Sequence, residues 1–217
     1  MKPILGILPA AQRAFWEEAQ SIPQNFVLYG GTALAMRLGH RQSIDFDFFS
    51  SSPLNLEELQ LPFLRDAEVL QREPNTATLR VDRGGSVIVS FFGNLSFGQL
   101  ESPAIAEPGG VKIASLADLM ATKLKTVVQR SEAKDYVDIA AILETGMSLA
   151  TGLAGANALF GPSFNSALPL KALVYFGDGD LETLPSGVRE QLLAAVMNTR
   201  ELPTMGRHGP IIGALDG

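Results

Sequence analysis

The first half of the chain consists of short apolar runs separated by turn-forming residues. Runs of this kind, rich in β-branched and aromatic residues and bounded by Gly, Pro, Asn or Asp, are typical of β-strands. They predict strands over residues 26–29, 43–49, 67–71, 76–81, 86–92 and 111–113. Residues 93–110 contain several glycines and prolines, so we expect them to be mostly irregular.

Apolar residues that recur every three or four positions mark the predicted helices, because this spacing gives a helix one apolar face. They predict helices over residues 9–20, 30–38, 54–64, 147–160 and 186–199, with two more between 115 and 145. Strands and helices alternate at first, and helices alone follow. The pattern therefore predicts an α/β (α+β) fold with a helical C-terminal portion.

The same pattern divides the 217 residues into three parts. We expect an α/β core over residues 1–113 and a helical portion packed on it over 114–202. The tail over residues 203–217 is rich in glycine, so we expect it to be loose.

The stretch from residue 26 to 49 combines a glycine turn with two carboxylates. Gly30 and Gly31 follow a predicted strand and open a helix, where the backbone can approach a ligand and free N–H groups attract phosphate. In the next strand Asp45 and Asp47 lie two residues apart, so both share one face with Ser43. The apolar residues of the other face are expected in the core: Ile44, Phe46 and Phe48.

Two carboxylates on one strand face repel each other unless a cation lies between them. We therefore predict a divalent metal ion at Asp45 and Asp47, beside a phosphate site at the glycines. Each feature has an ordinary alternative when it is taken alone. A strand-turn-helix unit with glycines is common, and the two aspartates could belong to a solvated strand face.

The composition limits the chemistry of such a site. The chain has no cysteine and only two histidines, which excludes thiolate and histidine-rich metal sites and favours Mg²⁺ or Mn²⁺ on carboxylates. The net charge of −6 argues against a protein that coats long nucleic acids, but it leaves contact with one RNA end open. We find no signal peptide and no apolar stretch of about 18 residues, so we expect a cytoplasmic protein without a membrane partner.

Thirteen residues separate Gly31 from Asp45, and the pattern resembles the signature of the DNA polymerase beta-like nucleotidyltransferase superfamily. More narrowly, Gly30-Gly31-Thr32-Ala33-Leu34 followed by Arg41-x-Ser43-x-Asp45-x-Asp47 is similar to the AbiEii/AbiGii toxin family of bacterial toxin–antitoxin systems. The resemblance implies a nucleotidyltransferase-like mixed β-sheet flanked by helices.

A second motif lies in the paired helices near the middle of the chain. Lys123 falls within an apolar helix face, where a lysine is costly unless it is paired. It could extend to solvent, meet a carboxylate or point toward phosphate. Asp135 and Asp138 share the face opposite the apolar stripe of the next helix, which on spacing alone is typical of a solvated surface. Together with Arg130, however, these residues look like the second half of the toxin family's signature.

The resemblance implies transfer of a nucleoside monophosphate from a nucleoside triphosphate, with Mg²⁺ or Mn²⁺ as cofactor. The implied catalytic residues are Asp45, Asp47, Lys123 and Asp135, and the implied metal ligands are Asp45 and Asp47. The implied nucleotide-binding residues are Gly30, Gly31, Thr32, Arg41, Ser43, Lys123 and Arg130. Arg41 could equally pair with Asp45 while the site is empty.

One feature departs from the superfamily pattern. These enzymes usually supply a third carboxylate from a later strand, and the only polar residue in the natural place, residues 87–92, is Ser90. Asp82 lies too near a turn to take that role. The protein could therefore be a slow enzyme, an enzyme that uses another base, or a protein that binds a nucleotide without catalysis.

Three functions remain open at this point. The first is a toxin that transfers a nucleotide to an RNA, such as a tRNA end, or to a protein, and that an antitoxin encoded nearby restrains. The second is a non-catalytic module that binds a nucleotide or a partner on the same scaffold. The third is a small-molecule transferase of the antibiotic-modifying kind.

Overall fold

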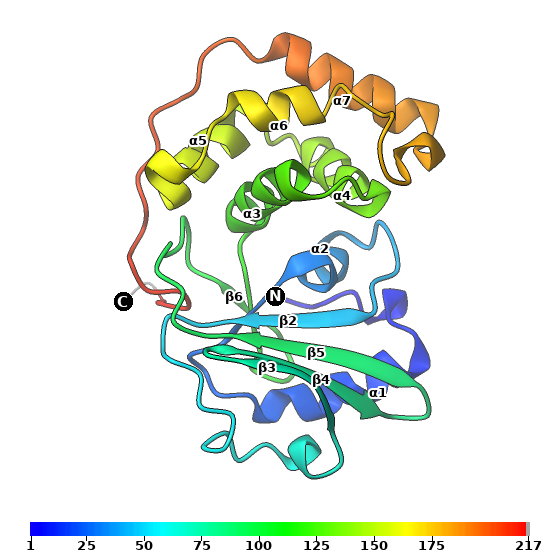
Figure 1. Ribbon diagram of the computed structural model, residues 1–217, viewed down its shortest axis with the longest axis vertical. Helices are drawn as coiled ribbons and strands as arrows, with labels where there is room; N and C mark the ends of the chain where they lie inside the picture. Colours follow the sequence, from blue (N-terminus) through cyan, green and yellow to red (C-terminus); the bar gives the residue numbers. More distant parts are fainter. Residues whose placement is uncertain (216–217) are drawn as a thin grey trace. The chain divides into compact units, whose positions relative to one another are not determined.

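The computed structural model describes residues 1–215, which form two compact units (Figure 1). The first unit contains residues 1–115 together with 208–215, and it carries the β-sheet. The second unit contains residues 116–207, and its regular structure is helical.

In the described chain, the first unit is built on a seven-stranded sheet. Its strands are β1 (Val27–Tyr29), β2 (Asp45–Phe49), β3 (Glu68–Glu73), β4 (Thr76–Asp82), β5 (Ser86–Phe92), β6 (Ala104–Ile105) and β7 (Lys112–Ile113). Their order across the sheet is β3-β4-β5-β2-β1-β7-β6. The pairs β2/β5 and β1/β7 are parallel and the other pairs are antiparallel, so the predicted mixed sheet is confirmed.

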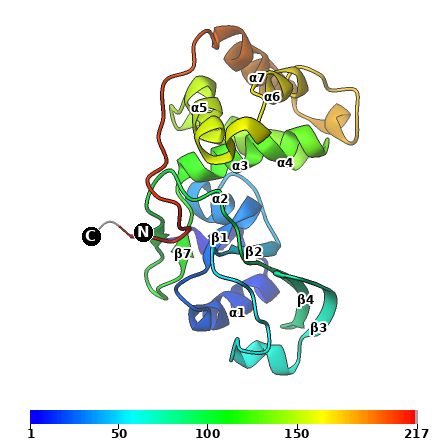
Figure 2. The ribbon, with the colours of Figure 1, turned by 60° about the vertical axis from the view of Figure 1, so that its left-hand side comes forward.

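Helices lie on both faces of this sheet. α1 (Ala10–Glu18) and α2 (Gly30–Leu38) are on opposite sides of it, as Figures 1 and 2 both show. Phe15 and Trp16 of α1 place their ring centroids 5.0 Å and 6.4 Å from that of Phe46, which seals the core on the α1 side. Three short 3₁₀ helices complete the unit: η1 (Leu5–Ile7), η2 (Ala19–Ser21) and η3 (Pro62–Arg65).

The alternation of β2 separates the core from the opposite face of the sheet. Phe46 and Phe48 are fully buried, whereas Asp45 is exposed and Asp47 is half-buried. The expectation that Ile44 enters the core was wrong, because this residue precedes β2 and its side chain is 52% exposed. Gln12 of α1 instead holds the backbone there, since its Nε2 donates to the Ile44 carbonyl oxygen at 3.3 Å.

Residues 54–64 do not form the predicted helix, and η3 is the only helical turn near them. Pro62 lacks a backbone N–H and cannot lie in a helix interior. The side chain of Asn55 accepts a hydrogen bond from the Glu57 N–H at 3.2 Å, which stabilises a turn in place of a helix. The short strand β6 was also not predicted, because it lies within the glycine- and proline-rich segment.

The second unit packs five α-helices in the described chain. They are α3 (Leu116–Gln129), α4 (Ala133–Glu144), α5 (Leu149–Phe160), α6 (Ala167–Ala172) and α7 (Ser186–Asn198), with the 3₁₀ helices η4 (Gly161–Ser163) and η5 (Leu181–Thr183). Gly152 lets α5 approach α3, because a Cβ there would come 2.5 Å from Met120 Cγ. α7 contacts α4, where Gln191 Nε2 donates to the Ala140 carbonyl oxygen at 3.0 Å.

None of the helices in the described residues has both the length and the apolar composition that crossing a membrane requires. A bent pair, Ala133–Glu144 with Leu149–Ser163, passes by length and composition alone, and its two helices make an angle of 114°.

The C-terminal tail is held on the first unit. The Gln99 N–H donates to the Gly209 carbonyl oxygen at 3.1 Å. The Gln99 side chain donates to the Ala214 carbonyl oxygen and accepts from the Gly213 N–H, both at 2.7 Å. Lys112 Nζ donates to the Gly213 carbonyl oxygen at 2.6 Å. For residues 209–214 these contacts differ from the expectation of a loose tail, which rested on glycine content and could not include hydrogen bonds to a distant loop. Residues 216 and 217 of the predicted tail lie outside the described residues.

Gln99→Ala is expected to loosen this tail. The Gly213 N–H and the Ala214 carbonyl oxygen would lose their partners, so the free energy of unfolding should fall by about 1–3 kcal/mol. Trypsin should then cleave after Arg207 faster than in the wild type, as followed by mass spectrometry. Gln71→Ala, which changes an exposed glutamine of β3, is the matched control. Equal cleavage rates in the two variants would contradict the role of Gln99.

Candidate functional site

The two glycines lie where β1 ends and α2 begins. Gly30 has a φ of +72°, a left-handed conformation that is costly for any residue with a Cβ. Tyr29, the residue before α2, makes no capping hydrogen bond with its side chain, and the first N–H groups of the helix carry the positive end of its dipole. This turn is therefore suited to bind an anion such as phosphate.

Asp47 lies directly against this turn. Asp47 is paired with Tyr29 across β1 and β2, which brings its carboxylate next to Gly30. A Cβ built on Gly30 would come 2.5 Å from Asp47 Oδ2, so the carboxylate occupies space that only a glycine leaves open. Asp45 lies two residues earlier on the same strand face, with its side chain exposed. The structure thus brings one predicted metal ligand into contact with the predicted phosphate turn.

A second group of polar side chains flanks Gly31. A Cβ there would come 2.5 Å from Arg41 Nη2 and 3.2 Å from Ser43 Oγ. The Thr32 side chain is fully buried, and its hydroxyl lies 2.8 Å from Ser43 Oγ and contacts the Asp45 carbonyl oxygen. Thr32 therefore ties α2 to the start of β2.

Asp45 and Asp47 provide hard carboxylate oxygens, the ligands that Mg²⁺ and Mn²⁺ prefer. In the parallel register of β2 and β5, Asp45 lies opposite Ile88 and Asp47 lies opposite Ser90. Ser90 is buried, and its Oγ lies 3.3 Å from Thr78 Oγ1. In the described part of the chain, no group of three His, Cys, Asp or Glu residues could hold a metal ion. Two carboxylates nevertheless fit Mg²⁺, which commonly keeps waters and substrate phosphates as its other ligands.

The second unit contains a cluster of four charges on α3, α4 and the turn between them, in which Lys123 and the two aspartates are buried and Arg130 is exposed. Lys123 Nζ lies 2.6 Å from Asp135 Oδ1 and 2.6 Å from Asp138 Oδ2. Arg130 Nε donates to Asp135 Oδ2 at 2.8 Å, and its Nη2 donates to Oδ1 at 3.3 Å. Both aspartates are fully buried. The interpretation of these aspartates as a solvated surface was therefore wrong, and the alternative in which Lys123 meets a carboxylate is confirmed.

Burial and ion pairing act in opposite directions on Asp135. Burial raises its pKa, whereas the hydrogen bonds and charges of Arg130 and Lys123 lower it, and the lowering dominates. A pKa below the unfolded-state value of about 3.9 means that ionised Asp135 stabilises the folded state above that pH. The stabilisation is lost as the pH falls below about 4 and through the folded-state pKa.

The predicted site residues thus fall into two groups. The first unit contains Gly30, Gly31, Thr32, Arg41, Ser43, Asp45 and Asp47, and the second contains Lys123, Arg130 and Asp135. Sequence reasoning gave Asp138 too little weight, because the periodicity of α4 does not show that a lysine from α3 covers its polar face. The only signal for this contact was the position of Lys123 within an apolar stripe.

Comparison with known proteins points to one family. Residues 15–205 match the family model described as "Nucleotidyl transferase AbiEii toxin, Type IV TA system". A candidate nucleotidyltransferase from H. pylori has a similar structure, with a TM-score of 0.53, 19% identity, and coverage of 85% of this chain and 89% of that chain. MenT4, a nucleotidyltransferase toxin from Mycobacterium tuberculosis H37Rv, aligns with a TM-score of 0.52 and 13% identity over 88% of this chain and 87% of that chain. At these identities the two structures show a shared fold.

A curated relative is closer in sequence. An uncharacterized protein of Aquifex aeolicus (strain VF5) is 33% identical over 138 residues, which is 61% of this chain. The matched region spans 65% of the length of that relative.

Lys123→Met is expected to destabilise the protein strongly. The substitution leaves Asp138 buried without the ammonium that neutralises it, and breaking a buried pair in this way costs about 3–5 kcal/mol. Urea denaturation should show this loss. Lys125→Met, at a half-exposed position of the same helix, is the matched control and should cost less than about 1 kcal/mol. Similar midpoints for the two variants would contradict a stabilising role of the cluster.

Proposed function

Because this chain belongs to the AbiEii nucleotidyl transferase toxin family, we propose that it is a metal-dependent nucleotidyltransferase and the toxin of a toxin–antitoxin pair. It would transfer a nucleoside monophosphate from a nucleoside triphosphate to an acceptor hydroxyl. The bond between the α- and β-phosphates breaks, and a bond from the acceptor oxygen to the α-phosphorus forms. The contact between the Asp47 carboxylate and the Gly30 turn supports this proposal most directly, because an acid then lies beside the turn that we propose for phosphate.

The glycine turn would bind the triphosphate. The first N–H groups of α2, at Gly30 and Gly31, donate to phosphate oxygens along the helix dipole. Ser43 Oγ and the Arg41 guanidinium flank Gly31, so both can add polar contacts to the same phosphates. The absence of a Cβ at both positions lets the backbone come close to the ligand.

Asp45 and Asp47 would hold the metal ion. A bound Mg²⁺ or Mn²⁺ would polarise the α-phosphate and neutralise charge on the departing pyrophosphate. The two carboxylates supply part of the ligand set, and phosphate oxygens and water would supply the rest. The aspartates and the glycine turn would thus act on the same nucleotide from adjacent sides.

Lys123 and Arg130 would neutralise the β- and γ-phosphates, and Asp135 would position Lys123. An ammonium has three N–H donors, and Asp135 and Asp138 take two of them. One donor of Lys123 therefore remains for a phosphate oxygen.

The acceptor would be an RNA end, such as that of a tRNA, or a protein hydroxyl. A net charge of −6 does not suit binding along a nucleic acid, whereas one end makes few phosphate contacts. An antitoxin is the expected protein partner.

A second candidate function is supported by the position opposite Asp47. Ser90 lies where a third carboxylate would complete a two-metal site, and it cannot act as a metal-neutralising acid or as a strong base. A protein with this arrangement could bind a nucleotide and transfer it slowly or not at all.

Asp47→Asn is expected to lower transfer roughly 100- to 1000-fold, because the amide keeps the shape of the side chain and loses the charge that binds the metal. The measurement is incorporation of α-labelled nucleoside triphosphate into total RNA or protein with Mg²⁺ or Mn²⁺. Glu73→Gln, at an exposed position on β3, is the charge-matched control. Nucleotide binding without transfer by the wild type, at every metal tested, would contradict the enzyme and support the binding module.

Gly31→Ala and Gly30→Ala should differ in their effect on stability, because only Gly30 has a positive φ. Gly31 has ordinary helical backbone, and its Cβ would displace mainly the flexible end of Arg41, so nucleotide affinity should fall about 10- to 100-fold at nearly unchanged stability. Gly30→Ala should also cost at least about 1–2 kcal/mol of stability because of its positive φ. Calorimetric titration with nucleotide and urea denaturation measure the two effects. Unchanged affinity in Gly31→Ala would contradict the phosphate site.

A further inference from the structure

Aromatic rings gather on the sheet face that carries the two aspartates. The ring centroids of Tyr29 and Phe49 lie 4.7 Å apart with the planes 13° from parallel. Phe92 meets Phe49 edge to face at 5.2 Å, and Phe97 meets Phe49 at 6.2 Å. We call these four residues the ring cluster. Tyr29 is buried, whereas the three phenylalanines are half-buried.

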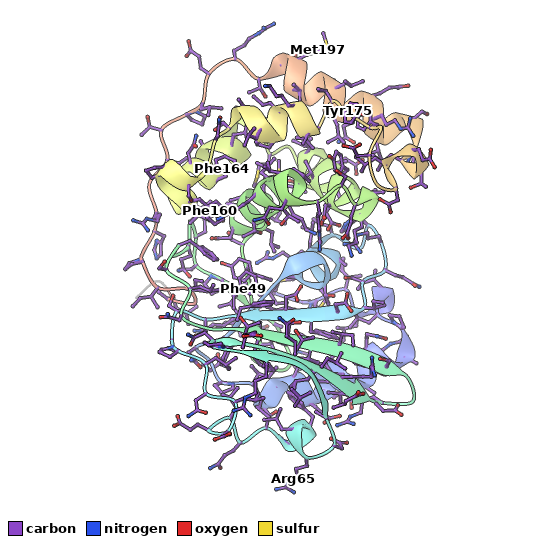
Figure 3. All side chains as sticks on the ribbon, in the orientation of Figure 1. Phe49, Arg65, Phe160, Phe164, Tyr175 and Met197 are labelled. Carbon is purple, nitrogen blue, oxygen red and sulfur yellow. The ribbon has the colours of Figure 1, made fainter. Side chains whose placement is uncertain are left out.

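The register of the sheet fixes this cluster beside the aspartates. Phe49 lies two residues beyond Asp47 on β2 and therefore shares its face. Phe92 lies opposite Phe49, just as Ser90 lies opposite Asp47. The cluster thus begins roughly 7 Å along the strands from the carboxylate pair. In Figure 3, Phe49 lies on the side of β2 away from α1, which is the side of the aspartates.

Two hydroxyl groups lie across the strands from Asp47. Ser90 Oγ and Thr78 Oγ1 lie 3.3 Å apart on neighbouring strands, on the same face as Phe92. A hydroxyl can both donate and accept a hydrogen bond, which suits the hydroxyls of a ribose. Beside Asp47 the face therefore offers two hydroxyls across the strands, on β5 and β4, and aromatic rings two residues further along β2 and β5.

The geometry of in-line displacement indicates whether the nucleotide donor or the acceptor would lie over these groups. The attacking oxygen and the departing pyrophosphate lie on opposite sides of the α-phosphorus. The proposed phosphate turn follows β1, on one side of β2, and β5 is the neighbour of β2 on the other side. The acceptor would therefore approach over β5, where Ser90 and Phe92 lie.

We infer that the ring cluster, with Phe92 as its principal contact, stacks the unpaired terminal nucleobase of an RNA acceptor. This inference rests on the proposed function, and it selects RNA over a protein hydroxyl as the acceptor. Every base has a π-face that can stack on an aromatic ring, so the contact tolerates different sequences. Stacking needs no basic surface, which agrees with a chain that carries a net charge of −6.

The test uses an RNA hairpin with a four-nucleotide unpaired 3′ end whose last base is 2-aminopurine. Stacking on the ring cluster should quench the fluorescence of this base when wild-type protein is added with Mg²⁺. Phe92→Leu should weaken the binding that gives this quench about 5- to 100-fold, since it removes the ring and keeps an apolar side chain. Phe92→Trp should retain it. Tyr175→Leu removes a ring of the second unit that is 59% exposed, labelled in Figure 3, and should change nothing.

Steady-state kinetics separate the acceptor from the donor. Phe92→Leu should raise the KM for the RNA with little change in the KM for the nucleoside triphosphate. A rise in the nucleotide KM alone would assign the rings to the donor base and overturn the inference. If circular dichroism shows that Phe92→Leu does not fold, Phe49→Leu replaces it as the variant that removes a ring. Phe92→Trp remains the variant that keeps one.

The inference and the proposed function can fail separately. Transfer to RNA with a quench that Phe92→Leu leaves unchanged would overturn the acceptor subsite and leave the nucleotidyltransferase standing. A Phe92-dependent quench without transfer would keep the RNA subsite and contradict the enzyme. Asp47→Asn should lose transfer and keep the quench, because the carboxylate does not touch the base.

Discussion

A carboxylate packed against a residue without a side chain is the constraint on which the rest of the first unit depends. Asp47 Oδ2 occupies the place that a Cβ of Gly30 would need, and Gly30 adopts a left-handed backbone conformation. This contact exists only in one register of β1 and β2, because a shift of one residue would turn Asp47 to the core face. Phe46 and Phe48 prevent that shift, since their burial against α1 fixes which side of β2 faces the core.

The aspartate pairs of the two predicted motifs differ in their environments, which favours different roles for them. Asp135 and Asp138 are fully buried and are neutralised by Lys123, with Arg130 on Asp135, so they are already satisfied within the protein. Asp45 is exposed and Asp47 is half-buried, so a cation from solution can reach them. Solvent access, and not the number of carboxylates, therefore favours the pair in the first unit as the proposed metal site, whereas the pair in the second unit is an internal counter-charge.

The sequence was sufficient where one local pattern determined the structure. The strand alternation and the glycine turn predicted β2, the start of α2 and the shared face of the two aspartates, because neighbours along the chain fix all three. The sequence pattern could not predict contacts between distant segments of the chain. The hydrogen bonds of Gln99 to the tail join residues more than 100 positions apart, and the burial of Asp138 depends on a lysine from another helix. The ring cluster likewise needs the register of β2 with β5, which no periodicity specifies.

The serine opposite Asp47 changes how the proposed site would be assembled. Two carboxylates alone bind Mg²⁺ weakly, because the ion gives up its water reluctantly and needs further oxygen ligands. A triphosphate held at the glycine turn would bring those oxygens next to Asp47, since the turn and the carboxylate are in contact. The metal would then bind together with the nucleotide, so the substrate itself would supply what a third carboxylate provides elsewhere. The close packing of Asp47 on Gly30 would then do more than position an acid, because it would couple the occupancy of the proposed metal site to that of the proposed phosphate site.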